Sequence, residues 1–377
     1  MEEKNIMDKY KKVATILNKA GEFPIPFTNT LFEILKYTVK DENLDFLMAF
    51  EENISQTMEQ LKTSSNLPKD EILKKVDALA KKGVIFDQPS RTGLMIYRLL
   101  PIARQSEYIF MQEHAPDPEI KRLASLFSDL HEELKNNYKD NSDKMMENFK
   151  NFPPIDRTVP ILRNQDGEQI ELEVNGEISV PSEDILPTQD IVELFKKYDD
   201  IAVGRCYCRH QREVLGEPCK QIALNVESCF TLGKSARHTS KHGFSRLISK
   251  EEAFELLKKI EEAGLVHKAY HLYSDPSREE VAVCNCCSCC CDNNKKHLIM
   301  PIKNASFWLA RVNEETCIGC GTCIDRCHNY AIELNGNNKA YIDENDCIGC
   351  GVCAYYCPEK AILLEYNKRY INIKPEL

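Results

Sequence analysis

Two runs of cysteines with one repeated spacing carry the clearest chemistry in this sequence. Each run has the form C-x2-C-x2-C-x3-C, and both lie within residues 317–358. This spacing holds [4Fe–4S] cubanes, with three close thiolates on one cluster and the fourth thiolate on the neighbouring cluster. The sequence therefore predicts a first cluster on Cys317, Cys320, Cys323 and Cys357, and a second cluster on Cys347, Cys350, Cys353 and Cys327.

A pair of structural zinc sites is the alternative for these runs, because C-x2-C also suits zinc. Zinc sites usually combine two C-x2-C units. Here each run carries four cysteines at one spacing, and the pattern occurs twice. The repeated spacing therefore favours iron–sulfur clusters over zinc.

Ten of the 18 cysteines lie outside these two runs. Six of the ten fall within residues 284–291, which is too dense for core packing and would expose free thiols to oxidation. Metal ligation is the role that this density supports. The ten candidate ligands are Cys206, Cys208, Cys219, Cys229, Cys284, Cys286, Cys287, Cys289, Cys290 and Cys291.

The partition of these ten cysteines among metal centres stays open at the level of sequence. The simplest partition places one [4Fe–4S] cluster on Cys206, Cys208, Cys219 and Cys229, and a second on four of the six cysteines in residues 284–291. An alternative mixes the two segments. A non-cubane cluster with five or more thiolates and a zinc site are further alternatives. We expect one or two clusters in addition to the first pair.

Histidines and arginines near these cysteines are weaker candidates for a function. His238 and His242 are four residues apart, which suits metal ligation from one helix face, but ordinary polar surface or pocket residues are the preferred interpretation. A basic group beside Cys206 and Cys208 would screen the charge of a thiolate-bound cluster, or hold an anionic substrate or partner. Its members are Arg205, Arg209, His210 and Arg212.

The elements that position these residues are expected to form an α+β multidomain chain. Residues 1–150 are predicted to be mainly helical, because apolar residues recur there at helical spacing. Within them, residues 66–101 read as helix, short strand, turn and strand, which resembles the last helix and wing of a winged-helix domain. Seven basic and four acidic residues between Lys69 and Arg98 make this module only weakly basic. Contact with another protein is therefore favoured over DNA binding.

Residues 151–308 are predicted to be a mixed α/β domain that carries the ten further cysteines. Alternating apolar residues and the Asn175-Gly176 turn signal indicate strands between residues 159 and 180. Ser249 followed by Glu252 indicates the start of a helix, and a hairpin after that helix leads to Cys284. Residues 309–377 are predicted to be a third domain, which holds the two repeated runs.

Composition adds bounds on location and partners. The net charge of −10 counts against broad nucleic-acid binding. The N-terminus lacks a basic start followed by an apolar run, and no stretch is long and apolar enough to span a bilayer. We therefore expect a cytoplasmic protein whose cysteines bind metal rather than form disulfides. So many oxygen-sensitive thiols indicate an anaerobic host.

Two stretches of the chain resemble known families. Residues 309–366 are similar to the bacterial ferredoxin domain with two [4Fe–4S] clusters, apart from His328 where the first run would usually have proline. Residues 199–291 resemble a cysteine-rich module found beside ferredoxin domains in strict anaerobes. That second resemblance rests on Cys206, Cys208 and Arg209, on Gly243-Phe244, on residues 263–266 and on the dense run at 284–291. Together the resemblances imply an iron–sulfur protein of anaerobic electron transfer.

The leading functional prediction is an electron-transfer protein, or a subunit of an anaerobic oxidoreductase, that passes low-potential electrons to a redox partner. The sequence contains no G-x-G-x-x-G after a strand and no Walker A run, so nucleotide chemistry would come from another subunit. One alternative is an enzyme whose unusual cluster at residues 284–291 binds substrate. The other is a redox-sensing DNA-binding regulator. Whether the chain is itself an enzyme stays open.

Overall fold

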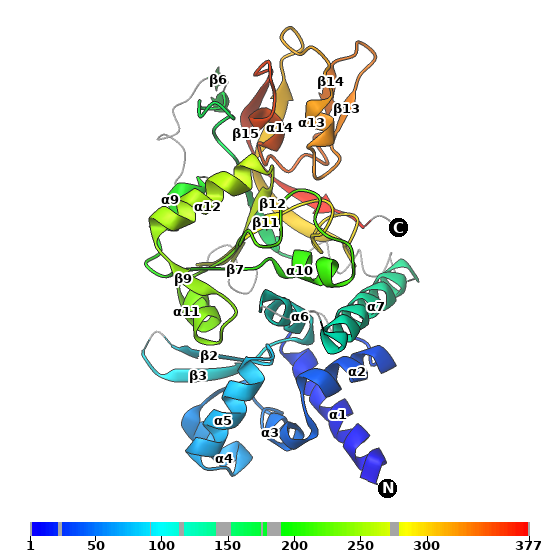
Figure 1. Ribbon diagram of the computed structural model, residues 1–377, viewed down its shortest axis with the longest axis vertical. Helices are drawn as coiled ribbons and strands as arrows, with labels where there is room; N and C mark the ends of the chain where they lie inside the picture. The colour runs from blue at the N-terminus through cyan, green and yellow to red at the C-terminus, as the bar shows by residue number, and fades with distance from the viewer. Residues whose placement is uncertain are drawn as a thin grey trace. The chain divides into compact units, whose positions relative to one another are not determined.

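A computed structural model describes residues 2–21, 25–90, 92–112, 117–140, 152–174, 176–178, 190–271 and 279–375 (Figure 1). The chain divides into two compact units. Unit 1 comprises Met1–Asn136, Gly204–Pro218 and Arg237–Arg246, and unit 2 comprises Asn137–Val203, Cys219–Ala236 and Leu247–Leu377. The three-domain division predicted from the sequence stays a prediction.

Unit 1 is mainly helical, as predicted for most of its length. Its helices pack around one apolar core that includes Leu17, Leu35 and Phe110. Two local signals start helices in unit 1: Thr28 caps α2 by accepting from Leu31 N, and Thr57 and Gln60 form a capping box at α4. The helices that lie wholly or mostly in unit 1 are α1 (Glu2–Lys19), α2 (Asn29–Thr38), η1 (Asp41–Asn43), α3 (Leu44–Met48), α4 (Met58–Ser65), α5 (Lys69–Ala80), α6 (Ile102–Met111), α7 (Pro118–Asp140), α10 (Tyr207–Val214) and α11 (Lys234–Lys241).

A three-stranded antiparallel sheet accompanies α4 and α5 in unit 1. Its strands β1 (Ser55–Thr57), β2 (Ile85–Pro89) and β3 (Met95–Leu99) have the order β1-β3-β2. The predicted helix, strand, turn and strand of residues 66–101 are therefore present as α5, β2 and β3. Gly83 lets the chain leave α5, because its φ is +68° and a Cβ there would lie 2.8 Å from the Tyr108 side chain.

Unit 2 is built on a ten-stranded mixed sheet with the order β6-β5-β15-β12-β4-β10-β11-β8-β7-β9. The two longest strands, β12 and β15, pair antiparallel, and β4 runs parallel to β12. The strands are β4 (Asp156–Val159), β5 (Leu172–Val174), β6 (Glu177–Ile178), β7 (Ile201–Gly204), β8 (Cys229–Leu232), β9 (Arg246–Ile248), β10 (Val266–His271), β11 (Glu280–Cys286), β12 (Ile302–Val312) and β15 (Ile362–Ile373).

Two helices, α9 (Ile191–Lys196) and α12 (Lys250–Glu262), pack on this sheet. Asp190 caps α9, and Ser249 caps α12 by accepting from Glu252 N, as its position predicts. The predicted hairpin that leads to Cys284 is formed by β10 and β11, which pair antiparallel with Val266 opposite Cys286. Residues 272–278 at its turn and Asn175 of the predicted β5–β6 turn lie outside the described residues.

The two repeated cysteine runs fold into a small pseudo-symmetric part of unit 2 between β12 and β15. Each run leads into a short helix, α13 (Thr322–Asp325) or α14 (Val352–Tyr355). The strands β13 (Ile332–Leu334) and β14 (Ala340–Ile342) form a two-stranded antiparallel sheet between them. Within the described residues, none of the helices is both long enough and apolar enough to span a bilayer.

Candidate metal centres

The loops of the two repeated runs depend on glycine. Gly319 and Gly349 occupy equivalent positions, with φ of +69° and +63°. A Cβ would lie 2.0 Å from Asn338 O at Gly319 and 2.0 Å from Trp308 O at Gly349. Because such a contact is impossible, these positions require glycine. The glycines let the loop backbone pass close to the backbone at Asn338 and Trp308.

The four cysteines predicted for the first cluster line one pocket. The other residues of the 317–323 loop also line it, together with Ala340, Pro358, Glu359, Ala361 and Ile362. The four cysteines are Cys317, Cys320, Cys323 and Cys357. Two backbone N–H groups donate to sulfur, from Ala340 to Cys317 at 3.5 Å and from Ala361 to Cys357 at 3.2 Å. Burial raises the pKa of Cys323 to about 11, and the neighbouring thiolates add to this shift. Cys320 is exposed, so this pocket has one open edge.

The four cysteines predicted for the second cluster are enclosed more completely. Burial raises the pKa of Cys350 to about 12, and the charges of Cys327 and Cys347 add to the shift. Burial also raises the pKa of Cys353 well above its usual value, with Cys350, Cys347 and Cys327 contributing. Ala331 N donates to Cys327 Sγ at 3.3 Å. The structure thus gathers the four predicted thiols where only a bound cation would let them ionise together.

Both sets of four cysteines fit the cluster that their spacing implies. Each offers four sulfur ligands, and N–H donors that stabilise thiolate charge and tune the potential of a cluster. A bound [4Fe–4S] cubane supplies one-electron chemistry.

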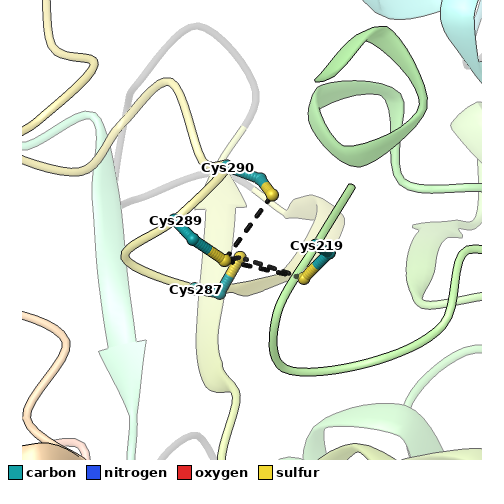
Figure 2. Close-up of side chains that lie close together, drawn as sticks. All are labelled: Cys219, Cys287, Cys289 and Cys290. Atoms are coloured by element: carbon teal, nitrogen blue, oxygen red, sulfur yellow. Dashed lines mark hydrogen bonds between the residues drawn. The ribbon is translucent and has the colours of Figure 1, made fainter. Parts of the chain in front are cut away.

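A different set of four cysteines forms a compact site in the middle of the sequence. Cys219 meets Cys287, Cys289 and Cys290, and all four sulfurs lie within 4.8 Å of one another (Figure 2). The Sγ–Sγ distances are 3.8 Å from Cys219 to Cys287 and 3.7 Å from Cys219 to Cys289. They are 3.5 Å from Cys289 to Cys287 and 3.6 Å from Cys290 to Cys289. We call this set the four-thiol site.

These spacings match a single tetrahedral ion. Metal–sulfur bonds of about 2.3 Å at tetrahedral angles place neighbouring sulfurs about 3.8 Å apart. Hydrogen bonds from Cys287, Cys289 and Cys290 lower the pKa of Cys219. Contact with Cys219 raises the pKa of Cys287 and that of Cys290. The four thiols therefore share little negative charge without a cation, and a bound metal ion would replace their protons.

The end of β11 and the turn after it position the four-thiol site. Asn285 Nδ2 donates to Ser228 O at 2.6 Å, which anchors the strand end beside β8. Cys287 and Cys290 belong to the apolar core of unit 2. His297 Nε2 lies 3.0 Å from Cys289 O and so fixes the turn. The site joins Cys219 with three cysteines of the dense run, which is the mixed partition.

His328 connects the four-thiol site to the first repeated run. Its Nδ1 accepts from Ser288 N at 3.2 Å, and Ser288 lies between Cys287 and Cys289. Its Nε2 lies 2.6 Å from Gly264 O and therefore donates to it. His328 also follows Cys327 directly in sequence. The residue that departs from the ferredoxin pattern is thus the link between two predicted metal centres.

A third thiol group consists of Cys284, Cys286 and Cys291. Cys284 and Cys286 lie two residues apart on β11. All three cysteines pack in one apolar cluster with Cys350 and Ile348 of the second run. Lys268, on β10 opposite Cys284, is buried and donates to Asp156 at 2.9 Å. Burial opposes the charge of Lys268, but Asp156, Cys286 and Cys291 outweigh it and raise its pKa. A buried cation therefore faces these thiols.

The remaining predicted site residues are distributed over both units. Cys229 is buried at the start of β8 in unit 2. Cys206 precedes α10 in unit 1, and Cys208 is buried within that helix. Of the basic group, Arg209 and His210 are buried, and His210 Nδ1 lies 2.8 Å from Phe110 O. Their predicted role beside a cluster stays a prediction.

A second compact group of potential ligands lies in unit 1. His238 and His242 are buried rather than at the surface, and both contact Asp87 of β2. Burial raises the pKa of Asp87, but hydrogen bonds from His238, His242 and Lys241 outweigh it and lower that pKa. Burial lowers the pKa of His238. Sequence spacing gave the two histidines, but no signal pointed to Asp87, which lies 151 residues before His238.

Comparison with known proteins concerns the two repeated runs. Residues 310–364 match the family described as a 4Fe-4S dicluster domain. No curated protein matches the chain. The match confirms the resemblance drawn from the cysteine spacing, and two [4Fe–4S] clusters are what such a domain implies. The C-terminal part of this chain is therefore a 4Fe-4S dicluster domain, preceded by a separate cysteine cluster in the middle region.

Proposed function

We propose that this protein transfers electrons between a redox partner and its own metal centres. The observation that carries the proposal is the dicluster domain at residues 310–364. The pocket lined by Cys317, Cys320, Cys323 and Cys357, and the mutual influence of Cys327, Cys347, Cys350 and Cys353 on their pKa values, support it. We assign the first cluster to Cys317, Cys320, Cys323 and Cys357, and the second to Cys347, Cys350, Cys353 and Cys327. The exposed Cys320 makes the first cluster the point of contact with the partner.

The four-thiol site is proposed to hold a single iron ion that acts as a third one-electron carrier. Its sulfur spacing of 3.5–3.8 Å supports one ion rather than a cubane. His328 joins it to Cys327 through one side chain and one hydrogen bond, which gives electrons a short bonded route to the second cluster. Further cubanes, as predicted from the sequence, would use cysteines outside these four.

Anaerobic quantification of iron, zinc and sulfide, with EPR of the reduced protein, tests this proposal. Two cubanes and one single iron give about nine iron atoms and about eight sulfides per chain. About twelve of each or more would place a further cubane in the middle region. One zinc that Cys287→Ser loses, beside about eight iron atoms, would make the four-thiol site structural. Fewer than about eight sulfides in fully loaded protein would contradict the dicluster assignment itself.

The wider setting is proposed on the same basis. We propose a cytoplasmic protein of an anaerobic host that serves as a component of an oxidoreductase, with the other subunits or a soluble carrier as redox partner. The three-domain division at residues 150 and 308 belongs to this proposal.

We also propose that β1, α4, α5, β2 and β3 form a winged-helix-like module that contacts protein. The order of these elements supports the module. The exposed face of α5 carries Lys69 and Lys74 together with Asp70, Glu71 and Asp77. A face with this mixture gives no net attraction to a phosphate backbone, so it favours a protein partner over DNA. A gel shift that shows salt-sensitive DNA binding by the holoprotein would overturn this choice.

A further inference from the structure

We propose that Asp87, His238 and His242 form a mononuclear binding site for a divalent metal ion of the first transition row, such as zinc or iron. The site is separate from the cysteine centres. The three residues come from β2 and from the end of α11, and all are buried. One ligand atom from each lies within 4.8 Å of the others. Two imidazoles and one carboxylate form a donor set that zinc and non-haem iron sites use.

The distances fit an ion after a small expansion of the site. Asp87 Oδ1 lies 3.1 Å from His238 Nδ1 and 2.7 Å from His242 Nε2. Metal–ligand bonds of about 2.0–2.1 Å at tetrahedral angles separate neighbouring ligand atoms by about 3.3 Å. The two imidazole nitrogens therefore need to move away from Asp87 Oδ1 by about 0.2 Å and about 0.6 Å. Both imidazoles point at the same carboxylate oxygen, so one ion can contact all three atoms.

The groups around the ligands support this arrangement. Lys241 donates to Asp87 Oδ2, which holds the second carboxylate oxygen and leaves Oδ1 for the ion. Asp77 Oδ1 lies 3.8 Å from His242 Nδ1, on the side of the ring away from Asp87. A carboxylate there favours a proton on Nδ1 and so directs the lone pair of Nε2 towards the ion. Within the described residues, the buried atoms His242 Nδ1 and His238 Nε2 have no hydrogen-bond partner.

Aromatic rings restrict water around the site. The ring centroids of Phe86, Tyr108 and Phe244 lie 4.1, 5.8 and 6.1 Å from that of His238. Electrostatic attraction between an ion and its ligands is stronger in such a poorly hydrated site. The ion would also lie near the C-terminal end of α11, which ends at Lys241, where the helix dipole favours positive charge.

The rival explanation is a metal-free ion-pair network, in which both imidazoles donate to Asp87. The test compares full-length holoprotein with the double variant His238→Gln/His242→Gln, both purified anaerobically. Zinc, iron and sulfide are measured for each. The proposal predicts that the variant loses one metal ion per chain while its sulfide content stays the same. Equal metal content in wild type and variant, both before and after addition of Zn²⁺, would overturn it.

A measurement on wild-type protein covers the case in which the variant fails to fold. The protein is treated with a mild chelator that leaves sulfide intact, and is then titrated with Zn²⁺ in a calorimeter. X-ray absorption at the zinc edge then reports the ligands. Nitrogen and oxygen scatterers at about 2.0–2.1 Å support the site, whereas sulfur scatterers alone at about 2.3 Å contradict it. Sulfide is not part of this readout, so either result leaves the electron-transfer proposal to its own test.

Discussion

The dicluster domain and the four-thiol site both gather cysteines, but they arrange sulfur differently. Among the described residues, the four thiols of the middle site lie within 4.8 Å of one another, and neither set of the dicluster domain is that compact. A cubane separates its thiolates by the width of its own iron and sulfide atoms, whereas a single ion draws them together. The spread of the sulfur atoms, more than their number, therefore indicates the kind of centre. The predictions below test this contrast.

The largest expected effect comes from Cys353→Ser, in the cysteine set predicted for the second cluster of the dicluster domain. Cys353 is buried with Cys347 in the apolar core of the dicluster domain. Serine is a poor ligand for iron, so we expect loss of the second cluster, with iron and sulfide each falling by about four per chain. Anaerobic metal and sulfide analysis measures both. A fall in iron without a fall in sulfide would mean that this cysteine set holds no cubane. The proposed difference between the dicluster domain and the four-thiol site would then be wrong.

A smaller change is expected from Cys287→Ser in the four-thiol site. This variant should lose one metal ion per chain and keep all of its sulfide. The matched control is Val283→Ala, which truncates a buried, non-ligand side chain on β11 in the same apolar core as Cys287. We expect the control to keep its metal and sulfide. Joint loss of iron and sulfide in Cys287→Ser would show that the four-thiol site binds an iron–sulfur cluster rather than a single ion.

A pair of glycine variants tests the cysteine-containing loops of the dicluster domain. At Gly349 an alanine Cβ would lie 2.0 Å from Trp308 O, but at Gly321 it would meet nothing within 4 Å. Both have positive φ, so Gly321→Ala should cost only the conformational penalty of about 1–2 kcal/mol. Gly349→Ala adds a backbone clash and should lower cluster occupancy and thermal stability more. Similar melting curves for the two variants would argue against a tightly fitted loop.

The smallest expected effect on metal content is that of His328→Ala, at the connection between the four-thiol site and the dicluster domain. The change leaves Ser288 N and Gly264 O without their partner at a buried position. Such a loss costs about 1–3 kcal/mol. We expect slower electron exchange between the middle centre and the second cluster, followed by EPR after rapid reduction. His328→Gln keeps a polar side chain and should lose less. Unchanged exchange rates in both variants would remove His328 from the electron route.

The dicluster domain was predictable because its ligands are local. The spacing of cysteines from Cys317 to Cys357, with glycine between them, identifies the loops without knowledge of the fold. Helix starts were equally local: the signals at Thr28 and Ser249 depend on side chains that bond within three residues. These features need no partner from a distant segment, so sequence spacing alone is enough to find them.

The four-thiol site and the histidine–aspartate site were less predictable, because distant segments form them. Cys219 reaches Cys287 across 68 residues, and Asp87 reaches His242 across 155 residues. The dense run at residues 284–291 indicated metal ligation, but its six cysteines divide between two groups. Which thiol joins which group depends on how β11 ends and where the loop that holds Cys219 returns. Periodicity carries no information about either.

The exposure of Cys320 has a consequence for how the protein meets air. Its sulfur is exposed, whereas Cys347 and Cys353 of the second set are buried and Cys327 and Cys350 are partly buried. Oxygen and chelators therefore reach the two cubanes unequally, and damage should begin at the outer one. We expect bleaching in air to proceed in two separated phases. The partially degraded protein would then retain an intact inner cubane that can no longer exchange electrons with the redox partner.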